Sequence, residues 1–210
     1  MELFEASRYR YVHPPDGDGY FCVGNAGECD GEARIPWNGA PTDPAKVRAL
    51  DVAPSAAQLR RPRLPGFLGD LPHLESLTVP AALAGLLGDR VPRTLVIHGE
   101  GETPVDVLAD IRSPLEALEI AGTGRRFPMT GLPTGLRALR LNGVRAEIDC
   151  ALLAGLQELD VLNSRTFVNL DAILDIPRVR FVNCGNGCGP SSPPGDSTSP
   201  TPEPVRTGGS

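Results

Sequence analysis

Long apolar runs are absent from this 210-residue sequence, and none approaches the about 18 residues that a membrane-spanning helix needs. The first fifteen residues, MELFEASRYRYVHPP, also lack the apolar segment of a secretory signal. Basic residues are in deficit, with 20 Lys and Arg against 26 Asp and Glu and a net charge of −6, whereas nucleic-acid binding usually needs a basic patch. We therefore expect a cytoplasmic protein that binds neither membranes nor nucleic acid.

Patterns that would indicate catalysis or a bound cofactor are also scarce. Of the three histidines, His98 lies beside two acidic residues, Glu100 and Glu102. The segment HGEGETP could hold a metal ion or serve acid–base chemistry, but a loop of this kind is more often simply exposed to solvent. The turns GEGETP and AGTGRRFP lack the strand–loop–helix context and the lysine of a phosphate-binding loop. We expect no enzyme activity and no cofactor.

What the sequence does contain is a repeated triplet, in which an apolar residue is followed three and five positions later by two more. The seven copies are Val47/Leu50/Val52, Leu74/Leu77/Val79, Pro92/Leu95/Ile97, Leu115/Leu118/Ile120, Leu136/Leu139/Leu141, Leu156/Leu159/Val161 and Ile176/Val179/Phe181. Their middle residues are 27, 18, 23, 21, 20 and 20 positions apart. The last two residues of each triplet alternate with period two, as in a half-buried strand. A period of this size indicates stacked repeats that bury one another's apolar faces.

This pattern resembles the leucine-rich repeat, whose consensus is L-x-x-L-x-L-x-x-N. The segments LEALEI, LRALRL and LQELDV, which begin at Leu115, Leu136 and Leu156, match its first six positions, and the resemblance covers residues 46 to 184. It implies an α/β fold: a right-handed solenoid of about seven repeats with a parallel β-sheet on its concave face. It also implies that this face binds a protein.

The Asn position of the consensus departs from the family pattern. It holds, in chain order, Ser55, Ala82, Glu100, Thr123, Val144, Ser164 and Cys184. Thr, Ser and Cys can still bond the neighbouring backbone, whereas Ala82 and Val144 cannot. We therefore expect irregular turns rather than a continuous asparagine ladder at this position.

Three regions are expected along the chain. Residues 1–45 do not fit the period and predict an N-terminal cap and connector, in which LFEASRYRYV and YFCVG form a hairpin and Trp37 packs on the first repeat. Residues 46–188 contain the repeats, and residues 189–210 predict a disordered tail because they have almost no apolar side chains. Between strands, PVDVLADI (104–111), EIDCALLAG (147–155) and VNLDAILDI (168–176) predict helical turns, more of them toward the C-terminus, while RRPRLPGFLGDLP predicts extended or 3₁₀ backbone.

The five cysteines, Cys22, Cys29, Cys150, Cys184 and Cys188, are expected to be free thiols, because no secretory signal is recognised. A four-thiolate zinc site would need the pair near the start and the pair near the end of the chain to meet. Stacked repeats would hold the two pairs at opposite ends, so no metal site is expected.

The predicted concave face carries the candidate binding residues. Its middle column reads Asp51, Thr78, Val96, Glu119, Arg140, Asp160 and Arg180, so the charge alternates over the last four strands. With residues from the flanking columns added, the candidate partner-binding set is Glu119, Arg140, Asn142, Glu158, Asp160, Arg178 and Arg180. Two interpretations remain open. The column is a recognition surface for a protein, or its charges, about 4.8 Å apart, pair with one another as a solvated face.

The sequence thus favours a non-enzymatic protein–protein interaction module that binds a protein partner through the concave face of a leucine-rich-repeat solenoid. The alternative is a structural or self-assembly scaffold that uses the solenoid ends or the tail. Much Ala, Gly, Pro and Arg with little Lys is typical of a bacterium with a high-GC genome.

Overall fold

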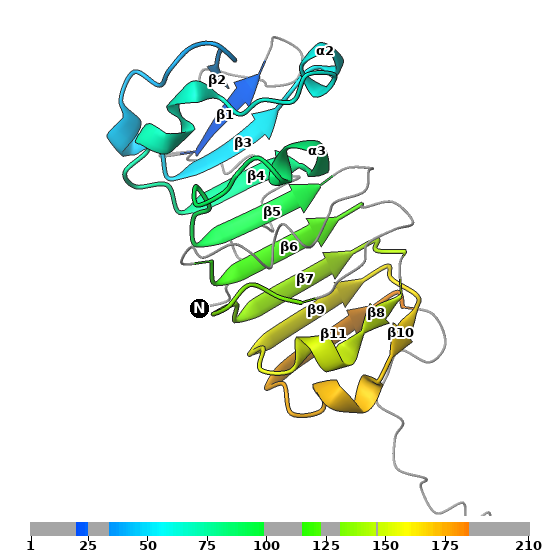
Figure 1. Ribbon diagram of the computed structural model, residues 1–210. Helices are drawn as coiled ribbons and strands as arrows, with labels where there is room; N and C mark the ends of the chain where they lie inside the picture. The colour runs from blue at the N-terminus through cyan, green and yellow to red at the C-terminus, as the bar shows by residue number, and fades with distance from the viewer. Residues whose placement is uncertain (1–19, 25–33, 99–114, 123–130, 146, 185–210) are drawn as a thin grey trace, which may run out of the picture.

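A sheet of nine parallel strands dominates the computed structural model, which describes residues 20–24, 34–98, 115–122, 131–145 and 147–184 (Figure 1). The strands are β1 (Tyr20–Gly24), β2 (Arg34–Ile35), β3 (Ala49–Ala53), β4 (Ser76–Pro80), β5 (Thr94–His98), β6 (Ala117–Ala121), β7 (Ala138–Asn142), β9 (Glu158–Leu162) and β11 (Arg178–Val182). Their order in the sheet is β11-β9-β7-β6-β5-β4-β3-β1-β2. From β3 onward, the strands of the sheet therefore lie side by side in the order of the chain.

The seven strands from β3 to β11 are the seven segments that the apolar triplets predict. Each is five residues long and contains the last two apolar residues of its triplet. Neighbouring strands pair in the register of the repeat, so Leu118 lies opposite Leu139 and Leu139 opposite Leu159. The strand prediction is confirmed for all seven segments.

The core lies between this sheet and the segments that connect its strands. Alternation within each strand turns two apolar side chains toward those segments, and these side chains are almost fully buried from Leu50 to Val161. The apolar residue that opens each triplet is also buried at Val47, Leu115 and Leu156. Equal positions in successive repeats thus form continuous apolar columns, which removes each strand's apolar face from water.

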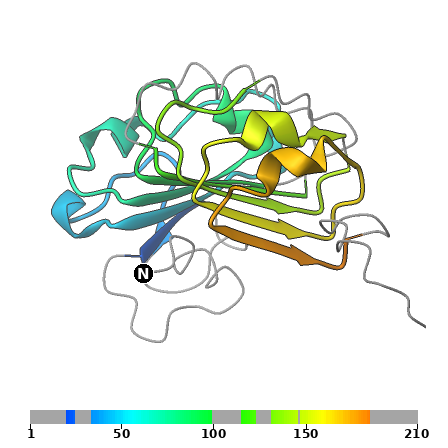
Figure 2. The ribbon, with the colours of Figure 1, turned by 90° about the horizontal axis from the view of Figure 1, so that it is seen from below.

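The described connecting segments gather on one side of the sheet, as Figure 2 shows. They contain two one-turn α-helices, α2 (Ala56–Leu59) and α3 (Ala81–Ala84), four 3₁₀ turns, η2 (Pro44–Lys46), η3 (Gly66–Asp70), η4 (Cys150–Leu153) and η5 (Leu170–Ile173), and a second two-stranded parallel sheet of β8 (Ile148–Asp149) and β10 (Phe167–Val168). The proline-rich segment before β4 forms the predicted 3₁₀ turn.

The prediction of more helix toward the C-terminus is wrong for the described residues, because both α-helices precede β5. The helical turns predicted in the segments 147–155 and 168–176 are present as the 3₁₀ turns η4 and η5, each of which follows one of the two short paired strands. The third predicted helical segment, 104–111, lies outside the described residues.

Left-handed backbone ends four of the strands. Gly122, Gly143, Asn163 and Asn183 follow β6, β7, β9 and β11 with φ between 53° and 70°, a conformation that glycine and asparagine adopt most readily. At the consensus Asn position one residue later, Ser164 donates to the carbonyl of Leu162 and accepts from the amide of Val144, and the Cys184 thiol contacts backbone carbonyls. The expectation that Ser and Cys bond the neighbouring backbone is therefore confirmed at these positions.

The N-terminal part of the sheet differs from the predicted hairpin. The segment YFCVG forms β1, which pairs in parallel with β3 on one edge and with β2 on the other. Both edges of β1 are occupied, so it has no place for an antiparallel partner, and the hairpin prediction is wrong for this strand. Trp37 packs against the apolar core as predicted. The rest of the predicted cap before Tyr20 and the predicted tail from residue 189 lie outside the described residues.

The apolar columns predict a large difference between two leucine truncations. Leu139 in β7 has none of its surface exposed, whereas Leu174 is 59% exposed. Leu139→Ala is expected to lower the free energy of unfolding by about 2 to 5 kcal/mol, because it leaves a cavity in the column. Leu174→Ala, the matched control, is expected to change it by less than about 0.5 kcal/mol. Urea unfolding followed by circular dichroism measures both, and equal losses would contradict the column as the core.

Candidate functional site

The register of the sheet aligns one side chain from each strand into a single column. Cys22 lies opposite Arg34 and Asp51. The column then runs through Thr78, Val96, Glu119, Arg140, Asp160 and Arg180. These side chains alternate with the core residues, so they lie on the opposite face of the sheet, which we call the ladder face. This face corresponds to the predicted concave surface.

Four charged residues at the C-terminal end of the column form a connected set of ion pairs, which we call the charged ladder: Glu119, Arg140, Asp160 and Arg180. Nε of Arg140 donates to Oδ2 of Asp160 at 2.8 Å, and its Nη1 lies 3.4 Å from Oε2 of Glu119. Arg180 donates to both carboxylate oxygens of Asp160, with Nε 2.8 Å from Oδ1. Asp160 is therefore bound by two guanidinium groups, one from each neighbouring strand.

Most of the charged ladder is buried, which corrects its interpretation as a solvated face. Glu119, Arg140 and Asp160 are 4%, 7% and 3% exposed. Burial removes water from these charges, and a buried ion pair contributes to the fold only if each charge finds a close partner of opposite sign. Alternation of sign along the column supplies those partners. The prediction that the charges pair with one another is thus correct, whereas the prediction that they are exposed to solvent is wrong for Glu119, Arg140 and Asp160.

The protonation state of Asp160 follows from two opposing effects. Burial raises the pKa of its carboxyl group, while the hydrogen bonds from Arg180 and Arg140, together with their positive charges, lower it. The two guanidinium groups outweigh burial, so the pKa lies below its ordinary value and Asp160 is ionised at neutral pH.

The other predicted binding residues surround the C-terminal end of the charged ladder. Arg178 lies opposite Glu158, with Nη2 3.4 Å from Oε2, and the arginine side chain is 55% exposed. The side chain of Arg180 is 53% exposed, in contrast to Arg140. Asn142 accepts a hydrogen bond from Asn163, which in turn accepts one from Asn183. The structure therefore brings all seven predicted residues onto one face of the sheet, where Glu119, Arg140 and Asp160 are buried and the two arginines of β11 are half-exposed.

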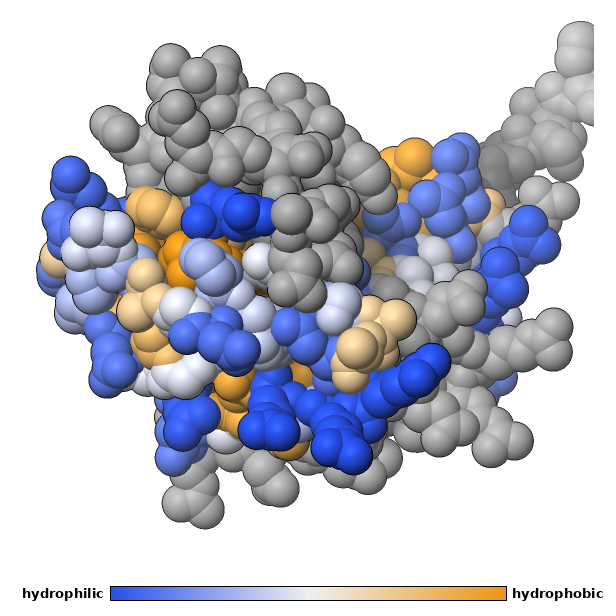
Figure 3. Space-filling model, turned by 90° about the horizontal axis from the view of Figure 1, so that it is seen from above, coloured by the Kyte–Doolittle hydropathy of each residue, from blue (hydrophilic) through white to orange (hydrophobic). Residues whose placement is uncertain are grey.

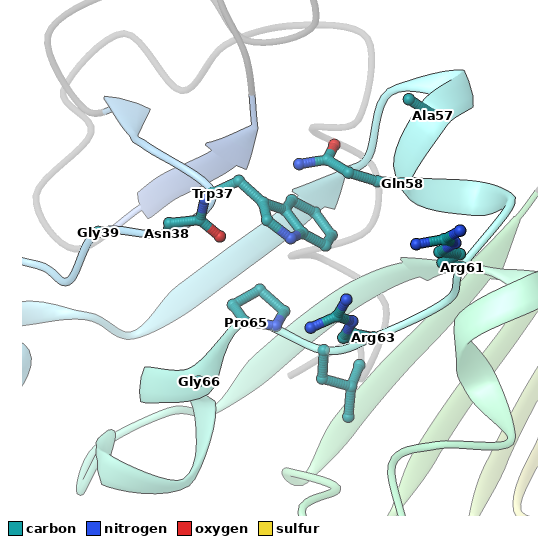
Figure 4. A pocket seen from close by; sticks show the side chains of 10 residues that line it. Trp37, Asn38, Gly39, Ala57, Gln58, Arg61, Arg63, Pro65 and Gly66 are labelled. Carbon is teal, nitrogen blue, oxygen red and sulfur yellow. The ribbon is translucent and has the colours of Figure 1, made fainter.

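A cavity that the sequence analysis did not predict lies at the other end of the sheet. It has a volume of about 630 Å³ and is lined by residues 37–39, by Ala57 and Gln58 of α2, and by Arg61 and residues 63–66. Figure 4 shows the indole ring of Trp37 between the side chains of Gln58 and Pro65, with Arg63 beside it and Arg61 farther away. Among the described residues, no carboxylate forms an ion pair with Arg61 or Arg63. Arg61 and Arg63 of the run RRPR (60–63) line this cavity together with Trp37. No sequence pattern links the run to Trp37, because the two are more than 20 positions apart.

The cysteines differ in state. Cys150 and Cys184 are reduced thiols as expected, and Cys150 is buried. Cys22 is disulfide-bonded, which contradicts the expectation of five free thiols, and its partner lies outside the described residues. The expectation rested on compartment alone and could not detect which side chains the fold brings together.

No group of three or more potential metal ligands occurs within the described part of the chain. His98 lies in β5 opposite Pro80 and Ala121 on the ladder face. Its acidic neighbours Glu100 and Glu102 lie outside the described residues. The expectation of no metal and no enzyme activity therefore stays a prediction.

Removal of the Asp160 carboxylate tests the charged ladder by its pH dependence. Because the pKa of Asp160 in the folded protein lies below its ordinary value of 3.8, the stability that ionisation provides is complete above that value and is lost as the pH falls through the folded-state pKa. Asp160→Asn is expected to cost about 3 kcal/mol at pH 7, and the difference from wild type is expected to shrink below about pH 4. Urea unfolding of the wild type and the variant, at pH 7 and below about pH 4, measures this difference in the free energy of unfolding. Asp175→Asn, at an exposed position, serves as the control, and a loss independent of pH would contradict the ionised ladder.

The single tryptophan allows a direct test of the cavity. Arginine side chains raise the local concentration of anions, so iodide is expected to quench Trp37 fluorescence more strongly in the wild type than in Arg61→Gln/Arg63→Gln. Acrylamide, which is neutral, is expected to quench both proteins equally. A fall in quenching by both agents would instead mean that the substitutions change the exposure of the indole ring.

Comparison with protein-family models, with curated proteins and with solved structures finds no match to this chain. Within the described residues, no helix is long and apolar enough to cross a membrane. The ladder face and the cavity beside Trp37 therefore have to be interpreted from their own geometry and charge.

Proposed function

We propose that this chain is a solenoid of the leucine-rich-repeat type and acts as a non-enzymatic protein-binding module. Three features support the repeat assignment: seven five-residue strands, their parallel pairing in the register of the triplets, and spacings of 20 or 21 residues between the last four. A unit of this kind cannot bury its apolar face alone, so the stack itself is the folding unit.

The observation that carries the proposed binding role is the exposed cationic end of the charged ladder. Arg178 and Arg180 expose about half of each side chain. Asp160 accepts hydrogen bonds from Arg180, and Arg178 forms an ion pair with Glu158 at 3.4 Å. An arginine that is already held in position loses less conformational freedom when a partner binds. The partner surface would carry carboxylate groups, which match the planar guanidinium.

The size of the surface adds a constraint on the partner. Nine strands at about 4.8 Å spacing span roughly 38 Å, and a standard interface buries about 800 Å² of each protein. Because the central part of the charged ladder is buried, the partner would contact the C-terminal strands and the adjacent turns. We expect an interface centred on β9 and β11.

A self-assembled scaffold is less well supported. Arg34 and Arg180 occupy the same column at the two ends of the sheet, so stacking of copies end to end would place like charges together. Hydrophilic side chains also predominate among the coloured residues on the face that Figure 3 shows. Such surfaces are not typical of the apolar interfaces that hold permanent assemblies together.

The proposed site is tested by charge reversal at an exposed arginine. Arg140→Glu is unsuitable, because it would place three carboxylates together in a buried ladder. Arg178→Glu reverses a half-exposed charge on the edge strand, opposite Glu158. It is expected to abolish capture of a partner from cell lysate while leaving the circular dichroism spectrum unchanged. Arg165→Glu, an exposed arginine in the turn before β10, is the matched control. Equal capture by the wild type and both variants would contradict a site at Arg178.

A further inference from the structure

We infer that the outer edge of β11 binds an extended acidic segment of a partner protein as an additional parallel strand. This inference rests on the proposed function and specifies its partner: acidic residues at the positions facing Arg178 and Arg180, alternating with apolar residues. It differs from the proposal above in that the backbone of β11, and not only its side chains, would form the contact.

The position of β11 in the sheet provides the first argument. It is the last strand in the order, and β9 occupies its inner edge. The carbonyl of Val182 accepts a hydrogen bond from Asn163 on the β9 side. Successive residues of a parallel strand direct their backbone groups to opposite edges, so those of Val179 and Phe181 point away from β9. Among the described residues, no strand pairs with that outer edge.

The two ends of the sheet differ in a way that favours β11. At the other end, β2 has only two residues, and a very short edge strand is a common protection against unwanted pairing. The edge strand β11 has five residues, and its Val179 is 38% exposed although equivalent positions in the preceding six repeats are fully or almost fully buried. The apolar column thus reaches the surface at β11, where a further apolar side chain could continue it.

Charge determines which kind of strand fits. Along the charged ladder the sign alternates strand by strand and ends on Arg180, with Arg178 beside it. A new strand in the same register would place its own residues opposite these two arginines. Acidic residues there would continue the alternation, whereas basic residues would oppose like charges across about 4.8 Å.

Repulsion between arginines excludes a second copy of this chain as the occupant. Parallel addition of a copy through β2 would bring Arg34 to Arg180, and antiparallel pairing of two β11 strands would bring the arginines of one copy close to those of the other. Like charges directly opposite each other are destabilising in a sheet. The positive charge of β11 therefore disfavours pairing with a second copy of this chain and favours pairing with an acidic segment.

The chain itself contains the sequence of a suitable probe. β9 already pairs with the inner edge of β11, placing Glu158 opposite Arg178 and Asp160 opposite Arg180. A peptide with the sequence of residues 156–163, LQELDVLN, would repeat these contacts on the outer edge by the same translation. The control peptide LQKLKVLN keeps the apolar pattern and reverses both charges.

The experiment measures binding of both peptides, labelled with fluorescein, to the full chain by fluorescence anisotropy. We expect LQELDVLN to bind at least about tenfold more tightly than LQKLKVLN, since two favourable ion pairs replace two like-charge contacts. Arg178→Glu is expected to prefer LQKLDVLN, in which the lysine faces the new glutamate. Because Arg178 is half-exposed, this variant is expected to remain folded. Hydrogen exchange at the amides of Val179 and Phe181 is expected to slow when LQELDVLN binds.

Three results would overturn the inference. These are equal affinities for the acidic and the charge-reversed peptide, binding that leaves the amides of Val179 and Phe181 unprotected, and a dimer in which those amides are protected without any peptide. Failure of the peptide together with capture that depends on Arg178 would reject strand addition and leave the proposed function intact. Peptide binding together with capture independent of Arg178 would support the edge and reject the proposed function's site.

Discussion

Parallel pairing in the register of the repeat is the constraint on which the rest of this structure depends. Once each five-residue strand lies beside the strand of the previous repeat, every side chain has its own counterpart as its nearest neighbour, about 4.8 Å away. Apolar positions stack into the columns that form the core. A polar position must therefore tolerate, or complement, the residue at the same position one repeat earlier, and this rule governs both the interior and the ladder face.

The rule is satisfied in two different ways in the C-terminal half. Asparagines bond to asparagines of the neighbouring repeat, because an amide both donates and accepts. Asn183 donates to its counterpart Asn163, and Asn163 donates to Asn142, which lies one position earlier in its own repeat. Charged residues cannot stack on their like, so Glu119, Arg140 and Asp160 alternate in sign. Alternation allows them to be buried, because each charge inside the ladder lies between two of opposite sign. Reversing the charge of one residue inside the ladder would place it beside two like charges in a buried site. The cost would be larger than that of losing one exposed ion pair.

The sequence predicted the strands well because strand position depends on a local pattern that the repeat displays seven times. It predicted which residues share the ladder face for the same reason, since register fixes Glu119, Arg140, Asp160 and Arg180 in one column. It did not predict that three of them are buried, because burial depends on the whole fold rather than on a neighbouring position. The cavity beside Trp37 joins residues 37 and 63 across a strand and a helix, and the parallel pairing of β1 depends on β2 and β3 together. Neither leaves a periodic signal.

A repeat structure has two ends that cannot both satisfy the rule of complementary neighbours. At β2 the problem is small, because two residues expose few backbone groups. At β11 all three kinds of column end together: Val179 ends an apolar column, Asn183 ends the asparagine stack and Arg180 ends the charged ladder. A residue of an added strand would therefore be preferred as apolar next to Val179, as an amide next to Asn183 and as acidic next to Arg180. Val179 and Arg180 lie in β11 and Asn183 follows it directly, so the three preferences lie close together in the chain. Together they specify a short sequence pattern, and a partner that meets all three would be distinguished from one that supplies negative charge alone.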